Sequence, residues 1–162
     1  MTTAEHKAID QAHDDAKMKR QIVAATTATG MLIRRADNRI EQGDEAIKKF
    51  AADLQGDHPA YAFQWAHNVM NATAARDIAR EIKKSVESIG TGTHTMWSLR
   101  DSVTSTVISS AKHPSFSTSP TSNLMEQFKN AALAEWANLL NDAIMHLEAN
   151  GLKQPKSTTD EA

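Results

Sequence analysis

The sequence contains no cysteine and few aromatic residues, and both shortages limit what the protein can be. Without thiols, the chain can form no disulfide, no zinc–thiolate site and no cysteine nucleophile. Aromatic residues make up 5% of the chain, which disfavours a sandwich or barrel because sheets rely on aromatic and β-branched side chains. The abundance of alanine instead favours closely packed helices.

Long apolar runs and a strong net charge are also missing. No run reaches the length of about 18 residues that a membrane-spanning helix needs, and the stretch MTTAEHKAIDQAHDDAK is too polar for a signal peptide. The formal net charge is −2, so the chain as a whole has no strong attraction for nucleic acid or anionic membranes. We therefore expect a soluble cytoplasmic protein with one domain over residues 1–151 and a disordered tail over 152–162.

Apolar residues at spacings of three, four or seven predict helices along most of the chain. The expected helices cover residues 2–42, 43–56, 57–89, 95–111 and 123–150, with a long loop over 112–122. Together they predict an all-α fold, a four- to five-helix antiparallel bundle around an alanine-rich core.

The first expected helix carries Met18, Ile22 and Leu32 on its inward face. We expect Gly43 to end this helix, because glycine commonly follows the last helical residue, and Gly30 to mark a kink or break in it. If unbroken, the helix would be roughly 60 Å long. Such a length exceeds the diameter of a compact domain of this size and would indicate oligomerisation.

The helices over residues 57–89 and 123–150 carry the broadest apolar faces. We expect them to pack against each other. Their combined apolar surface exceeds what a small monomer needs, which favours a homo-oligomer or a groove that accepts a partner helix.

The segment SIGTGTHTMWSLRD, residues 88–101, allows two interpretations. A glycine-rich turn before a helix can bind a nucleotide or phosphate through its backbone N–H groups and nearby polar side chains. The candidate ligand-binding residues are Thr91, Gly92, Thr93, His94, Trp97 and Arg100. The same residues suit an ordinary junction between two helices, with Gly90 as the stop, Thr93 or Thr95 as the cap and Trp97 in the core. We favour this second interpretation.

Basic side chains recur on the helix over residues 57–89, where they could follow a nucleic-acid backbone. The candidate nucleic-acid-binding residues are Arg76, Arg80, Lys83 and Lys84. Acidic residues alternate with them, and such alternation is more typical of a solvated helix face. Nucleic-acid binding is therefore the less favoured alternative.

No pattern of catalytic or cofactor-binding residues stands out. The chain lacks Glu-x-x-His, a Walker A sequence and G-x-S-x-G. His6, Asp10 and His13 share a helical face and could hold a divalent ion, but the charged residues around them favour a solvated face. We expect no enzymatic activity, no metal and no cofactor.

These features favour a non-enzymatic protein–protein interaction module. Small regulatory, inhibitory or assembly proteins have this composition, viral and mobile-element accessory proteins among them. We expect such a module to self-associate and to bind a macromolecular partner. Ligand binding over residues 90–100 and nucleic-acid binding by the basic face remain the alternatives.

Overall fold

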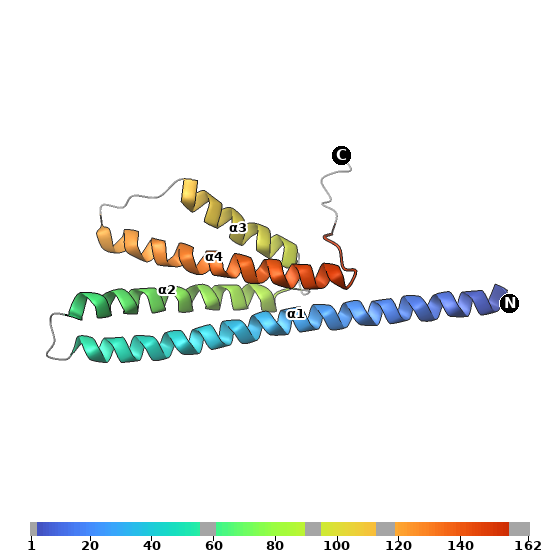
Figure 1. The fold of residues 1–162 in the computed structure, drawn as a ribbon, viewed down its shortest axis with the longest axis horizontal. Coiled ribbons are helices and arrows are strands. Elements are labelled where there is room, and N and C mark those ends of the chain that lie inside the picture. The colour runs from blue at the N-terminus through green and yellow to red at the C-terminus, as the bar shows by residue number, and fades with distance from the viewer. Residues whose placement is uncertain (1–2, 56–60, 90–94, 113–118, 156–162) are drawn as a thin grey trace.

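A computed structural model describes residues 3–55, 61–89, 95–112 and 119–155. The regular structure in these ranges is entirely helical and consists of α1 (Thr3–Leu54), α2 (Ala62–Glu87), α3 (Met96–Lys112) and α4 (Pro120–Ala149). Each helix runs antiparallel to the one before it (Figure 1). The predicted all-α bundle is therefore confirmed. None of the described helices is both long and apolar enough to cross a membrane.

The four helices do not pack symmetrically around one axis. α1 and α2 form a long hairpin, α4 lies along α2 and the middle of α1, and α3 lies on the side of α4 away from α1 (Figure 1). α2 and α4 thus pack together within one chain, as the breadth of their apolar faces predicts. α3 rests chiefly on α4, from which it separates toward its C-terminal end (Figure 1).

The core forms where all four helices meet. α1 contributes mainly alanine, so the larger side chains of α2 and α4 can lie close to its backbone. Leu140 of α4 is fully buried at its centre, between Trp136 and Ile144 one turn away on either side. The buried apolar side chains are Ala24, Ala28, Leu32, Ala36, Ala74, Ile78, Ala79, Ile82, Val86, Met96, Trp97, Val103, Trp136, Ala137, Leu140, Ile144 and Leu147.

The expected end of the first helix at Gly43 is wrong, and so are the separate helix over 43–56 and a break at Gly30, because α1 is one helix of 52 residues that includes both glycines. Gly43 is buried against α2: a Cβ atom there would lie 2.7 Å from the Cβ of Arg76 and 3.2 Å from the carbonyl oxygen of Ala72. Gly43 therefore serves the close approach of two helices and not the end of one. At about 1.5 Å per residue, α1 is about 78 Å long.

The last helix begins earlier than predicted and ends as predicted. Ser119 is the N-cap and accepts a hydrogen bond from the backbone N–H of Ser122 at 3.4 Å, and Pro120 occupies the first turn, where no N–H is needed. At the other end, Gly151 adopts a φ of 83°, and the N–H of Leu152 donates to Leu147 O at 3.1 Å. This left-handed stop is the one that glycine favours.

Parts of the predicted loop and tail, residues 113–118 and 156–162, lie outside the described residues. Within the described part of the tail, Leu152 packs against the core.

The N-terminal part of α1 projects beyond the body of the bundle (Figure 1). Gln21 donates a hydrogen bond from Nε2 to the carbonyl oxygen of Gly151 at 2.8 Å, so the end of α4 lies level with Gln21. The described side chains before it, from Asp10 to Arg20, are all exposed. About 18 residues, or about 27 Å of helix, therefore have no neighbouring helix among the described residues.

Candidate protein-binding surface

Four large apolar side chains of α1 are exposed near the point where the helix leaves the bundle. Met18 is 61%, Ile22 59%, Val23 63% and Met31 57% accessible to solvent. The sequence places Met18 and Ile22 on the inward face with Leu32, but only Leu32 is buried. The sequence does contain one indication of their exposure. An unbroken first helix is longer than a compact domain of this size, so part of it must lie outside the bundle.

Two of these side chains, Met18 and Ile22, lie on the face of α1 that packs against α2 farther along. A spacing of seven residues returns to nearly the same face of a helix. This face of α1 carries Asp15, Ile22, Thr29, Ala36 and Gly43. Ala36 is fully buried and Gly43 touches α2, whereas Ile22 is exposed. The difference arises because α2 ends at Glu87.

Ion pairs show where α2 ends relative to α1. The Nζ of Lys83 lies 2.7 Å from Oδ1 of Asp37, and Lys83 is only four residues from the end of α2. α2 therefore stops close to residue 33 of α1, and the apolar face of α1 continues past it.

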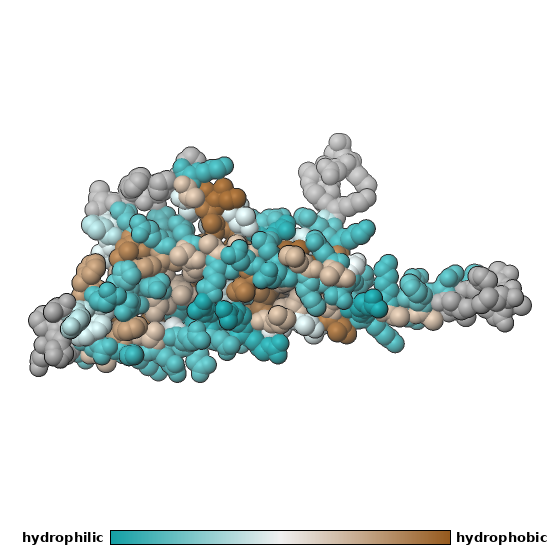
Figure 2. Space-filling view, viewed as in Figure 1, coloured by the Kyte–Doolittle hydropathy of each residue, from teal (hydrophilic) through white to brown (hydrophobic). Residues whose placement is uncertain are grey.

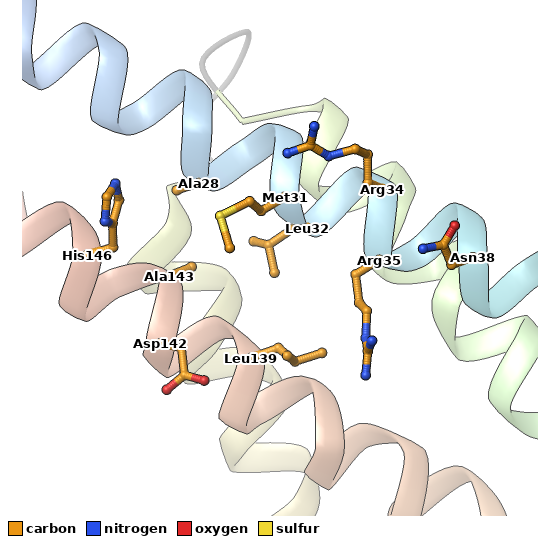
Figure 3. Close-up of a pocket in the computed structure, with 10 residues that line it drawn as sticks. All are labelled: Ala28, Met31, Leu32, Arg34, Arg35, Asn38, Leu139, Asp142, Ala143 and His146. Atoms are coloured by element: carbon orange, nitrogen blue, oxygen red, sulfur yellow. The ribbon is translucent and has the colours of Figure 1, made fainter.

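The other two exposed side chains, Val23 and Met31, lie beside α4. A hollow of about 610 Å³ runs between α1 and α4, with Met31 and Leu32 on one side and Leu139 and Ala143 on the other (Figure 3). Val23 lines a second hollow next to it, which also includes His146. His146 borders both hollows, so they are neighbours in the groove between α1 and α4.

Basic residues border this groove on the α1 side. Arg35 points along it toward α4, while Arg34 points away (Figure 3). Arg35 and Arg39 both pair with Glu135 of α4, which ties the two helices together. Within the described residues, Arg34 has no carboxylate partner.

The surface seen in Figure 2 is mainly hydrophilic, and apolar side chains reach it in separate patches. Isolated apolar side chains are normal on a monomer, whereas a cluster on one element indicates a contact surface. The cluster on α1 is therefore the strongest candidate for a binding surface.

The candidate ligand segment is described only in part. Thr91, Gly92, Thr93 and His94 lie outside the described residues, as does Gly90. Thr95 precedes α3, and its Oγ1 accepts a hydrogen bond from the Ser98 N–H at 3.1 Å while its own N–H donates to Ser98 Oγ at 2.9 Å. This reciprocal cap is the helix start that the favoured interpretation expects.

Trp97 and Arg100 both have partners within the protein. Trp97 is 6% exposed, and its indole N–H lies 3.3 Å from Oε1 of Glu148. The Nη2 of Arg100 lies 2.6 Å from Oδ1 of the adjacent Asp101. Ligand binding by this segment stays a prediction, and no contact of these two side chains favours it.

Three of the four candidate nucleic-acid-binding residues pair with carboxylates. Arg76 lies 3.1 Å from Asp44 and 2.9 Å from Asp77, and Arg80 lies 3.3 Å from Asp44. The third, Lys83, is the partner of Asp37 on α1.

These contacts raise the pKa values of two of the basic side chains. The hydrogen bond to Asp77, with a smaller contribution from Asp44, raises the pKa of Arg76, and the hydrogen bond to Asp37 raises the pKa of Lys83. Arg76, Arg80 and Lys83 therefore pair across the contact between α2 and α1. Lys84 is exposed and has no carboxylate partner among the described residues.

Metal binding finds no further support in the described residues, where no three histidine, aspartate or glutamate side chains are grouped so as to hold an ion. The side chain of His6 is not among those described, and Asp10 and His13 are exposed.

Comparison with protein-family models, with curated proteins and with solved structures gives no match for this chain.

Proposed function

We propose that the protein is a non-enzymatic interaction module that binds other proteins, copies of itself included, through the exposed part of α1. The observation that carries the proposal is the exposure of Met18, Ile22, Val23 and Met31 on one helix. Burying one such side chain contributes about 1.5–3 kcal/mol, so a partner that covers even the two on one face, Met18 and Ile22, is favoured.

The structure of α1 supports this role in a second way. Its outer part, before Gln21, has no neighbouring helix among the described residues, and its side chains from Asp10 to Arg20 are exposed. An isolated helix of about 15 residues is marginal in water, because most helical stability comes from packing. A partner along the outer part of α1 would supply that packing.

A regulatory, inhibitory or assembly role and a cytoplasmic location belong to the same proposal. Such a protein acts by occupying a surface of another macromolecule, for which a projecting helix about 27 Å long is suited.

The test is size-exclusion chromatography with light scattering, over a range of concentrations. The wild-type protein is expected to be larger than a monomer. The double variant Met18→Lys, Ile22→Lys is expected to associate at least about tenfold more weakly, because two charged side chains would be buried in the contact. Its melting temperature should change little, since both side chains are exposed in the single chain.

The control variant is Met145→Lys, which changes an equally exposed methionine on α4 and not on α1. It should associate like the wild type. A wild-type protein that is monomeric throughout, or a control that weakens association as much as the double variant does, contradicts the proposal.

A further inference from the structure

The exposed stripe of α1 has a spacing that identifies the kind of surface it is. Gln11, Asp15, Met18 and Ile22 follow one another at intervals of four, three and four, so they lie on one side of the helix. Gln11 and Asp15 are joined by a hydrogen bond from Nε2 to Oδ1 at 3.4 Å, and all four side chains are exposed. This spacing is that of a helix–helix contact.

The direction of a partner helix follows from the bundle itself. The stripe continues the face of α1 on which Gly43 packs against α2, and α2 runs antiparallel to α1 (Figure 1). A helix that extends this packing beyond Glu87 would take the place of α2 and run in the same direction as it. The stripe therefore fits an antiparallel helix.

When the stripe is reversed, its charges meet charges of opposite sign. In an antiparallel pair centred between Ala16 and Lys17, Gln11 of one copy lies opposite Ile22 of the other, and Asp15 lies opposite Met18. Lys19, next to Met18, then comes beside Asp15 of the second copy, and this ion pair forms twice. A parallel pair would place the two Asp15 carboxylates opposite each other, which is unfavourable.

The length of the unpartnered helix matches the same arrangement. In this register Thr3 of the second copy is level with Gly30, which lies just past the end of α2. The second copy would therefore cover the exposed part of α1 without meeting α2.

We infer that two copies of the chain pair through residues 11–22 of α1 in antiparallel orientation, with the apolar side chains Met18 and Ile22 buried between them. The inference rests on the proposed function and adds to it the identity and the direction of one partner.

The absence of cysteine allows a direct test. Gln11→Cys and Ile22→Cys proteins, distinguishable by mass, are mixed and oxidised mildly, and the disulfide-linked species are identified by mass spectrometry. The antiparallel pair predicts a disulfide between the two variants and none within either variant alone. In this arrangement two copies of residue 11 are about 16 Å apart along the axis, beyond the reach of a disulfide.

The outcomes separate the inference from the proposed function. A Gln11→Cys homodimer would show parallel pairing and overturn the inference. No disulfide in any mixture, together with a wild-type protein that is larger than a monomer, would overturn the inference alone. A monomeric wild-type protein would overturn both.

Charge reversal provides an independent test by light scattering. Asp15→Lys and Lys19→Asp should each weaken self-association about tenfold, because each reverses two ion pairs of the symmetric contact. An equal mixture of the two variants should recover wild-type affinity. The control is Lys17→Asp, which makes the same charge change on another face of the helix and should have no such effect. A mixture that stays as weak as the separate variants contradicts the antiparallel pair.

Discussion

Gly43 of α1 and Arg76 of α2 are so close that a methyl group at Gly43 would lie 2.7 Å from the Arg76 Cβ. The two helices would have to move apart to admit it, because the nearest atoms are close to the α2 backbone and not at the end of a flexible side chain. We predict that Gly43→Ala lowers the free energy of unfolding by about 1–3 kcal/mol. Urea denaturation followed by circular dichroism measures this change.

Gly30 provides the matched control, because it lies in the same helix and a Cβ atom there would have nothing within 4 Å. We predict that Gly30→Ala raises the free energy of unfolding by up to about 1 kcal/mol, since alanine is the better helix former. The same urea titration measures it. Loss of stability in this variant would show that α1 needs glycine at position 30 for another reason.

Substitution of Trp97 tests whether residues 90–100 are a junction between two helices or a ligand site. We predict that Trp97→Ala lowers the free energy of unfolding by about 3–5 kcal/mol, because a large buried side chain is lost and Glu148 loses its indole partner. Arg100→Ala should change stability by less than about 1 kcal/mol, because Arg100 pairs with an exposed neighbour. Thermal and urea denaturation check both values. If inorganic phosphate raised the melting temperature of the wild type and not of Arg100→Ala, the segment would be a ligand site.

Lys83 makes stability depend on pH in the alkaline range. Its hydrogen bond to Asp37 raises the pKa of Lys83 above the usual 10.5 in the folded protein. The charged amine therefore stabilises the fold fully below that usual value, and this contribution is lost as the pH rises through the raised folded value. We predict that the free energy of unfolding, measured from neutral pH to about pH 11.5, falls more steeply in the wild type than in Lys83→Met.

Lys84 is the control for this measurement. It is the next residue on α2, is exposed, and has no carboxylate partner among the described residues. Lys84→Met should retain the pH dependence of the wild type. Equal slopes in the wild type and Lys83→Met would mean that the contact between Lys83 and Asp37 does not stabilise the fold.

The apolar spacing of the sequence was sufficient to predict that the chain is helical and that α2 packs against α4, although it divided α1 into two helices. It was also sufficient to predict the stop at Gly151, because a left-handed stop is a local property of the backbone. Gly43 could not be interpreted in the same way. Glycine ends helices and also permits close helix contacts, and only the position of Arg76 shows which applies.

The exposure of the candidate binding surface also depends on where the neighbouring helices lie. Met18 and Leu32 both suit an inward face by spacing, since they lie fourteen residues apart on one helix. Their exposure differs because Leu32 has α4 beside it and Met18 lies beyond the end of the bundle. The alternation of charges on α2 indicated ion pairs, but the carboxylates that form them across the contact are Asp37 and Asp44 of α1.

The sequence by itself determined that this chain is helical, that its core is rich in alanine, where α3 lies and where α4 ends, because these follow from the local preferences of neighbouring residues. The tertiary structure decided that α1 is one helix, that it extends beyond the ends of α2 and α4, and which of its apolar side chains remain exposed. These depend on where another helix stops, and the end of α2 is more than fifty residues from Ile22 along the chain.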